Sequence, residues 1–342
     1  MNILLTGIGG FIGYHVTKKL IQQGHVVIGI DNLSDYYDVN LKKNRLKNLK
    51  ITLNNQNRKY LTNNLIFYKI DISNKVNVQK VFLENKIDAV CHLAAQAGVR
   101  YSIKNPEAYI KSNILGFQNI IDCCKDYDIN NFSYASSSSV YGGNTNLPFN
   151  EFQRVDAPIS LYAATKKSNE LVAYTYSHLY RIRATGLRFF TVYGPWGRPD
   201  MALFLFVKAL IQDKPIEIFN EGEMLRDFTF IDDIVEGVVR VIQNPALSPN
   251  KPTDLNPTMA PYKIYNIGNN NPVKLLDFIR IIEKILNKKF KIIFKPLQPG
   301  DVPKTYANVN LLEKELDFKP KTSIEDGIGR FVSWYLKYYK VK

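Results

Sequence analysis

The first 31 residues contain the feature that most restricts the fold of this 342-residue chain. Residues 2–6 form a short apolar run, typical of a buried strand, which leads directly into a glycine-rich stretch. In that stretch Gly7, Gly10 and Gly13 have the spacing of a variant dinucleotide-binding fingerprint. Glycines at such positions permit a tight turn and let a pyrophosphate approach backbone N–H groups at a helix N-terminus. The stretch therefore predicts a dinucleotide site.

The residues after the glycines complete a strand–helix–strand unit. Apolar side chains recur at helical spacing up to residue 23, and Gly24 follows as a helix-terminating glycine. Residues 25–30 form a second apolar run that ends at Asp31. An acidic residue at this position holds the adenosine ribose, which favours NAD over NADP. A glycine-rich turn without a ligand is the less favoured interpretation, because all five features occur together.

Strands and helices continue to alternate up to residue 190, which predicts a Rossmann-type doubly wound parallel sheet. The further strands are expected at 65–70, 87–92, 131–135 and 183–189, and the helices at 41–49, 75–85, 106–127 and 157–181. Residues 50–64 are interpreted as a surface insertion without function. We expect residues 1–190 to form an NAD-binding domain to which 231–268 return, with 191–230 and 269–342 forming a smaller α/β substrate lobe.

The ends of later strands offer further cofactor contacts. Asp71, after the third strand, is placed to bond an adenine amino group. Small residues at Ala94 and Ala95, after the fourth strand, leave room for a flat cofactor, although close helix–strand packing also explains them. Asn113 lies in the helix expected at 106–127, on a face that the sequence does not assign.

A tyrosine and a lysine on one helix indicate proton-transfer chemistry. Tyr162 and Lys166 are four residues apart, so both side chains lie on one face. We expect the lysine ammonium to lower the pKa of the tyrosine, while a hydroxyl from the serine run at 136–139 bonds the same substrate oxygen. The spacing alone is a weak signal, because the chain has 21 tyrosines. The sequence does not show which serine points inward.

The composition of the chain restricts the ligands and partners that we expect it to bind. The net charge is +14, but the basic residues are scattered, which favours an anionic nucleotide substrate over nucleic acid. Cys91, Cys123 and Cys124 lack Cys-x-x-Cys spacing, and the four histidines lack metal-ligand spacing, so we expect reduced thiols in a cytoplasmic protein and no metal. No signal peptide precedes Met1 and no apolar run is long enough to span a bilayer, so no membrane partner is expected.

With the glycine motif, the serine run and the Tyr–Lys pair in this order, the chain resembles the extended short-chain dehydrogenase/reductase family. More narrowly it resembles the nucleotide-sugar epimerases and dehydratases, and within them the UDP-glucuronate 4-epimerases. The resemblance covers essentially the whole chain. Its motifs lie at residues 7–13, 31–33, 35–38, 94–100, 136–142, 162–166, 188–201 and 299–302.

The resemblance implies residue roles. The catalytic residues would be Tyr162 as the base, Lys166, and Ser137 as the favoured helper hydroxyl, with Ser138 and Ser139 as alternatives. The NAD-binding residues would be Gly7, Gly10, Phe11, Ile12, Gly13, Asp31, Asn32, Asp71, Ile72, Leu93, Ala94, Ala95, Asn113, Tyr162 and Lys166. The substrate-binding residues would be Gln96, Arg100, Thr191, Arg198, Arg226 and Asp301, with Thr191 and Arg198 at a carboxylate and Arg226 at the diphosphate.

Departures from the family pattern select among its activities. Dehydratases carry Thr-Asp-Glu where this chain has serines at 137–139, so elimination of water loses its acid and base. Glucose-type 4-epimerases carry Tyr-Phe-Asn where this chain has Phe189-Phe190-Thr191, which, together with Arg198, favours a uronic acid. Asn308 replaces a frequent aspartate, which puts a role for an acid there in doubt.

The resemblance therefore implies NAD-dependent interconversion of UDP-glucuronate and UDP-galacturonate through a transient 4-keto sugar. Alternatives within the family are a UDP-glucose or UDP-N-acetylglucosamine 4-epimerase and a UDP-glucuronate decarboxylase. An alternative of another class is an NAD-binding regulatory or RNA-binding protein, which would not need the Ser–Tyr–Lys set. The resemblance also implies a homodimer formed through the helices at 106–127 and 157–181, although their apolar faces could instead pack on the sheet.

Overall fold

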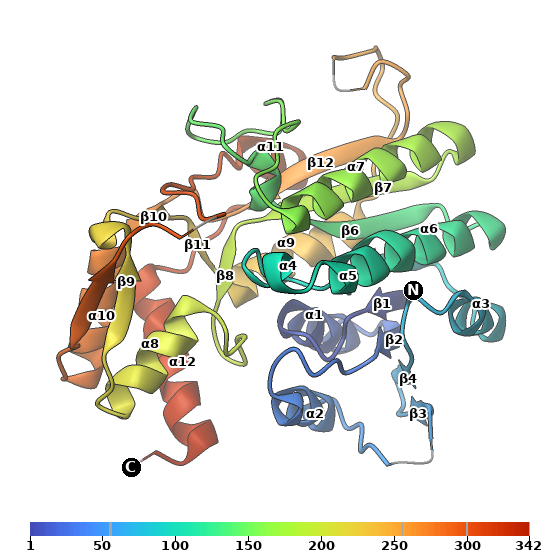
Figure 1. The fold of residues 1–342 in the computed structure, drawn as a ribbon. Coiled ribbons are helices and arrows are strands. Elements are labelled where there is room, and N and C mark those ends of the chain that lie inside the picture. The colour runs from blue at the N-terminus through green and yellow to red at the C-terminus, as the bar shows by residue number, and fades with distance from the viewer. Residues whose placement is uncertain (55–56, 255, 299, 342) are drawn as a thin grey trace.

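The computed structural model describes residues 1–54, 57–254, 256–298 and 300–341 (Figure 1). Residues 55 and 56 of the expected surface insertion, residue 255, residue 342 and Pro299 of the last resemblance motif lie outside this description.

A single large sheet dominates the described part of the chain. Its eight strands have the order β12-β7-β6-β5-β1-β2-β4-β3, and every pairing is parallel except the antiparallel pair of β3 with β4. Their bounds are β1 Asn2–Thr6, β2 Val26–Asp31, β3 Lys59–Leu61, β4 Leu65–Lys69, β5 Ala89–His92, β6 Asn131–Ser137, β7 Arg183–Phe189 and β12 Tyr262–Ile267. The predicted doubly wound parallel sheet is confirmed.

Helices cover both faces of the sheet because its central strands are apolar on both sides. In β1, Ile3 and Leu5 face one core cluster, whereas Leu4 faces the other. The first face carries α1 (Phe11–Gln22), α2 (Val39–Asn48) and α9 (Ile231–Gln243); the second carries α3 (Lys75–Glu84), α6 (Gly116–Asp126) and α7 (Leu161–Tyr180) (Figure 1).

Two helices differ from their predicted course. The helix expected at 106–127 is divided into α5 (Pro106–Tyr109), a π-helical segment (Ile110–Leu115) and α6, preceded by the short α4 (Tyr101–Lys104). The helix expected from 157 begins at Leu161, because the Ser160 hydroxyl accepts a hydrogen bond from the Ala163 N–H (3.1 Å) and caps it. This start places Tyr162 in the first turn of α7.

The smaller lobe lies beside the carboxyl edge of the sheet (Figure 1). It contains α8 (Ala202–Ile211), α10 (Leu275–Leu286) and α12 (Ile324–Tyr339), with the parallel pair β9 (Ile216–Phe219) and β14 (Ile292–Lys295) and the antiparallel pair β10 (Leu225–Arg226) and β13 (Val273–Lys274). A further parallel pair, β8 (Thr191–Tyr193) and β11 (Phe228–Phe230), lies between sheet and lobe, and α11 spans Asn310–Leu316.

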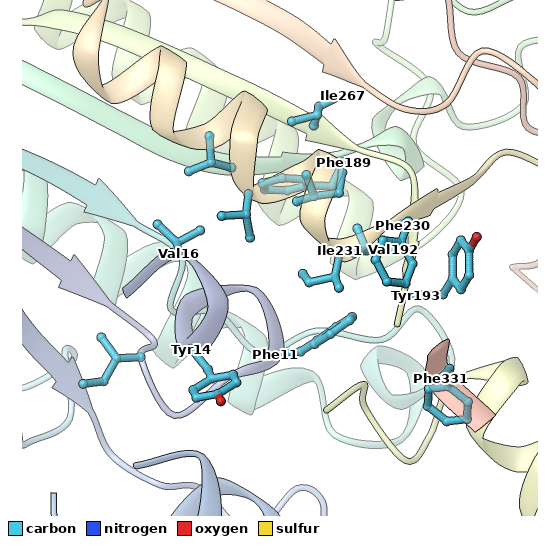
Figure 2. Packing of buried hydrophobic residues seen from close by; sticks show 14 of the residues in the cluster. Phe11, Tyr14, Val16, Phe189, Val192, Tyr193, Phe230, Ile231, Ile267 and Phe331 are labelled. Atoms are coloured by element: carbon cyan, nitrogen blue, oxygen red, sulfur yellow. The ribbon is translucent and has the colours of Figure 1, made fainter. Parts of the chain in front are cut away.

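The sheet domain and the lobe share one hydrophobic core. Figure 2 shows Phe11 of α1, Val192 of β8, Phe230 of β11 and Phe331 of α12 within a single cluster. This shared core fixes the lobe against the glycine-rich turn, which is why a crevice between them has a defined shape. No helix among the described residues has both the length and the apolar character needed to cross a membrane.

Five short strands were not predicted: β3, β8, β10, β11 and β13. β3 lies within residues 50–64, which the sequence analysis interpreted as a surface excursion, and it adds an antiparallel edge to the sheet. β8 and β11 pair in parallel across a separation of more than thirty residues, so no local pattern marks them.

Candidate active site

A cavity of about 830 Å³ lies where the carboxyl ends of the parallel strands face the lobe. Ligands bind at this edge in doubly wound sheets. Most of the predicted site residues line the cavity: Gly7, Gly10, Phe11, Ile12, Gly13, Asp31, Asn32, Ile72, Leu93, Ala94, Ala95, Gln96, Arg100, Ser137, Ser138, Tyr162, Lys166, Thr191, Arg198, Arg226 and Asp301.

Two predicted cofactor residues are not among the described lining residues. Asp71 turns to its own loop, where it accepts hydrogen bonds from the Ser73 N–H and hydroxyl, and it accepts a third from Asn32 Nδ2 (3.3 Å). Asn113 is buried behind the wall and bonds both backbone groups of Gln96, at 2.8 and 3.0 Å. The structure thus makes Asn113 a support for the Gln96 backbone.

The glycine-rich turn forms a cradle that side chains would fill. Gly7 has a φ of +81°, and a Cβ at Gly13 would lie 2.1 Å from the Gly7 carbonyl oxygen. Helix α1 begins after Gly10 without a side-chain cap, and its first turn carries no acidic residue. Its first N–H groups are therefore available to an anion, and the helix dipole favours negative charge there.

The carboxylate of Asp31 borders the same turn. Its Oδ2 accepts a hydrogen bond from the Gly9 N–H (2.9 Å), and its Oδ1 accepts one from the Leu33 N–H (2.7 Å). Each carboxylate oxygen keeps a further lone pair, so the group can still accept from a ribose hydroxyl while the backbone holds its orientation.

Tyr162, Ser137 and Lys166 lie together on the opposite wall. Burial raises the pKa of Tyr162, and a hydrogen bond with the Ser137 hydroxyl and the charge of Arg198 oppose this shift. Lys166 Nζ donates to the Ala135 carbonyl (2.8 Å), and burial lowers the pKa of Lys166 to about 8. The prediction that Lys166 lowers the pKa of Tyr162 is therefore wrong. The pKa is raised, because desolvation of the buried phenol outweighs the groups that lower it.

The serines of the 136–139 run point to different partners. Ser136 donates its hydroxyl to buried Glu170 (2.6 Å) and supports the core behind the site. Ser137 contacts Tyr162 and also accepts a hydrogen bond from the Ser139 N–H (3.2 Å). Ser138 and Ser139 line the cavity in a 3₁₀ turn that follows β6. Of the four hydroxyls, the structure brings Ser137 to the tyrosine.

Two arginines, each paired with an aspartate, line the cavity on the side that faces the lobe. Arg198 donates two hydrogen bonds to Asp200, one of them from Nε (3.0 Å), and Tyr36 donates its hydroxyl to the same carboxylate (3.1 Å). Arg100 forms an ion pair with Asp301 (2.7 Å). Both arginine forks and both carboxylates face the same cavity.

Arg226 differs from these two arginines in having no ion pair among the described residues. Its Nη1 donates to the carbonyl oxygens of Leu225 (3.1 Å) and Pro303 (2.9 Å), and burial lowers its pKa. Its Nη2 contacts the Met224 sulfur (3.9 Å), so a cavity-lining cation without a carboxylate partner is available to an anionic ligand.

Sequence reasoning assigned no role to several residues that shape the site. Tyr36 and Asp200 form the contact with Arg198, and Lys42 lines the cavity beside Asp31 while donating to the Ser34 carbonyl (2.6 Å). The sequence shows both the aromatic pair at residues 36–37 and the aspartate two residues after Arg198. It does not show that Tyr36 and Asp200, 164 residues apart, are in contact.

Comparisons with known proteins agree with this geometry. The model of the NAD dependent epimerase/dehydratase family matches residues 3–268. The protein CapI of Staphylococcus aureus is 55% identical over 345 residues, which cover 99% of this chain and all of that protein. The probable UDP-glucuronate 4-epimerase of Rhizobium meliloti is 44% identical over 345 residues, covering 99% of this chain and 98% of that protein.

A solved structure is similar over the same length. It is the UDP-glucuronic acid 4-epimerase from Bacillus cereus in complex with UDP-glucuronic acid and NAD, at 32% identity and a TM-score of 0.86. The similarity covers 99% of this chain and 100% of that one.

Proposed function

Because the chain belongs to the NAD-dependent epimerase/dehydratase family, we propose that it binds NAD and inverts C4 of UDP-glucuronate, giving UDP-galacturonate. The observation that carries the proposal is the cavity itself: a phenol–serine pair and a buried lysine on one wall, a dinucleotide cradle beside them, and arginines on the lobe side.

The residues present fit NAD. The pyrophosphate would lie against the uncapped N-terminus of α1, where a side chain at Gly13 would collide with the turn. Asp31 would hold the adenosine ribose with its remaining lone pairs. Lys166 would hold the nicotinamide ribose from the position that the Ala135 carbonyl gives it. When bound, NAD supplies the hydride acceptor and later the hydride donor.

Tyr162 carries the proton of the reaction. As the phenolate, a form that the Ser137 hydrogen bond and the charge of Arg198 favour, it takes the proton of the C4 hydroxyl as that carbon is oxidised to the ketone. It returns the proton when the ketone is reduced on its other face. The Ser137 hydroxyl, already bonded to Tyr162, donates to the same substrate oxygen. Between the two steps the sugar turns about its diphosphate, which Arg226 and Arg100 hold.

The carboxylate end of the sugar needs its own restraint. The 4-keto intermediate is a β-keto acid, which readily loses carbon dioxide, so an epimerase must hold the carboxylate. Thr191 and Arg198 line the cavity for this role. Nη1 of Arg198 has no hydrogen-bond partner among the described residues, because Asp200 takes Nε and Nη2. A neutral sugar would offer this nitrogen no carboxylate.

The test is product analysis of the purified protein with UDP-glucuronate and no added NAD. We expect UDP-galacturonate, because the cofactor is regenerated in each cycle and stays bound. Carbon dioxide release in place of epimerisation would indicate a decarboxylase, and an unchanged substrate with turnover of UDP-glucose would indicate a neutral-sugar enzyme.

We further propose the assembly and setting of the protein. A homodimer would cover exposed apolar side chains on the helices of the second sheet face: Ile103, Ile110, Leu115, Leu171 and Leu179. A cytoplasmic role in polysaccharide biosynthesis suits three free buried cysteines and a nucleotide-sugar substrate. Light scattering on the purified protein tests the dimer.

The proposed domain division follows the topology. Residues 1–190 would be the NAD-binding domain, and residues 231–268 would return to it, since α9 packs on α1 and β12 pairs with β7. Residues 191–230 and 269–342 would bind the substrate.

A further inference from the structure

Arg45 on α2 is a fully buried cation, with 0% of its surface exposed. No carboxylate among the described residues lies within ion-pair distance of it. Charged side chains are seldom buried unless they are paired, because desolvation of the charge costs several kcal/mol. A cation in this position therefore needs an explanation beyond surface chemistry.

The guanidinium of Arg45 is held by oxygens from three separate loops. It donates to the Gly9 carbonyl (2.8 Å), the Tyr37 hydroxyl (2.7 Å), and the carbonyls of Trp196 (2.6 Å) and Gly197 (3.3 Å). Gly9 belongs to the glycine-rich turn, whereas residues 196 and 197 belong to the loop that follows β8. Arg45 therefore fastens the cofactor turn to a loop of the lobe side.

The fastened loop is conformationally strained. Trp196 has a φ of +63°, a left-handed backbone conformation that is unfavourable for a residue with a Cβ. Its ring packs against Trp334 and Tyr338, with centroids 5.3 and 5.0 Å away. Such a conformation persists only where the surroundings hold it, and the hydrogen bond from Arg45 to the Trp196 carbonyl is part of that hold.

Arg198 follows two residues after this strained position. On the cavity side a second connection reaches it, because Tyr36 bonds Asp200 and Asp200 bonds Arg198. Tyr37, whose hydroxyl accepts from Arg45, is adjacent to Tyr36, so the loop after β2 contacts both connections. The backbone two residues before Arg198 is thus held by Arg45, and the guanidinium of Arg198 is held through Asp200 by Tyr36.

We propose that Arg45 is the positioning residue for Arg198, so that the turn which holds the cofactor also sets the arginine that holds the substrate carboxylate. This proposal rests on the proposed function. Of the two anionic groups of the substrate, it predicts a loss at the carboxylate and not at the diphosphate, because Arg45 touches neither the loop at 300–302 nor Arg226.

The test is Arg45→Lys, which keeps the charge but lacks the planar fork and cannot reach all four oxygens. We measure KM for UDP-glucuronate and the inhibition constant of UDP, which has the same diphosphate but no carboxylate. The expected result is a KM raised about tenfold, the effect of weakening one charge-assisted hydrogen bond to the substrate, with an inhibition constant changed less than about twofold.

Arg240→Lys is the matched control. Arg240 also donates to backbone carbonyls, those of Leu316 (2.7 Å) and Asp317 (2.8 Å), but it lies away from the cavity, so both constants should stay at their wild-type values. If Arg45→Lys does not fold, as judged by circular dichroism, Tyr37→Phe removes one of the four oxygens that hold Arg45, with an expected rise in KM of about threefold and the same small change in the inhibition constant of UDP.

Two results overturn the positioning role: no change in either constant, or an equal change in both. If the wild-type protein does not convert UDP-glucuronate, the proposed function fails by itself. If the wild type does convert it and the constants of Arg45→Lys do not separate, only the positioning role fails.

Discussion

Glu170→Gln breaks a buried ion pair directly behind the active site. Glu170 of α7 accepts hydrogen bonds from Arg188 Nε and Nη2, both at 2.9 Å, and from the Ser136 hydroxyl at 2.6 Å. Both partners of the ion pair are at most 3% exposed. The glutamine keeps the shape of the side chain but leaves the Arg188 cation buried without its counter-charge.

The expected loss of stability is large for one substitution. Removing one partner of a buried pair costs about 3–5 kcal/mol, because the remaining charge is desolvated and unpaired. For a chain of this length that corresponds to a melting temperature lowered by about 4–7 °C. A second neutral substitution, Arg188→Met on the Glu170→Gln background, should recover part of the loss, since it removes the unpaired charge.

The same substitution should lower turnover. Glu170 lies one helical turn after Lys166 in α7, and Ser136 precedes Ser137 in β6. The hydrogen bond from Ser136 to Glu170 therefore joins the two elements that carry the proton shuttle. A loosened junction should reduce kcat about tenfold or more and leave KM little changed, since misplacement of reacting groups by a fraction of an ångström is costly.

The assay is urea unfolding and initial-rate kinetics on the same preparations. Glu236→Gln is the control, because Glu236 pairs with Arg240 in a solvent-exposed i,i+4 arrangement worth at most about 1 kcal/mol. If Glu170→Gln lowers the free energy of unfolding by less than about 1 kcal/mol, the ion pair does not have the predicted stabilising role. A change in KM without a change in kcat would refute its role in placing the proton shuttle.

Three other predictions follow from the site and its surroundings. Tyr162→Phe should lower kcat by about 10²–10⁴-fold while bound NAD is retained, and near-normal turnover would exclude it as the proton carrier. Gly13→Ala should abolish NAD retention, measured as nucleotide released on denaturation, because its Cβ would lie 2.1 Å from a backbone oxygen; Gly329→Ala, with open space around it, should retain NAD. Burial lowers the pKa of His92 to about 3, so the unfolded state binds the proton first and stability falls as pH drops below about 6.5. Between pH 7 and pH 4, the free energy of unfolding of His92→Asn, measured in urea, should fall by about 3 kcal/mol less than that of the wild type. An equal fall in both proteins would contradict the lowered pKa.

The sheet was predictable because its signals are local. The strands predicted at 2–6, 25–30 and 65–70 are largely apolar runs, and the glycine spacing places the cofactor cradle without knowledge of the rest. The family and the NAD cofactor were recognised from motifs in a fixed order, and the comparisons support both. β3, β8, β10, β11 and β13 escaped prediction because two or three residues carry no periodicity.

The electrostatics of the site could not be read from the sequence. The spacing of Tyr162 and Lys166 correctly indicated a shared helix face, but burial decides the direction of the tyrosine pKa, and burial is a property of the whole fold. The contact of Tyr36 with Asp200 and the burial of Arg45 likewise depend on loops brought together by the core that sheet and lobe share.

The most direct test of the account uses UDP-glucuronate that carries deuterium at C4. If hydride leaves C4 and returns to the same carbon inside one closed cavity, the UDP-galacturonate formed in ordinary water keeps its deuterium, as nuclear magnetic resonance or mass spectrometry would record. Product that has exchanged this deuterium for solvent hydrogen would contradict the mechanism, because it would require a route in which C4 is deprotonated rather than oxidised.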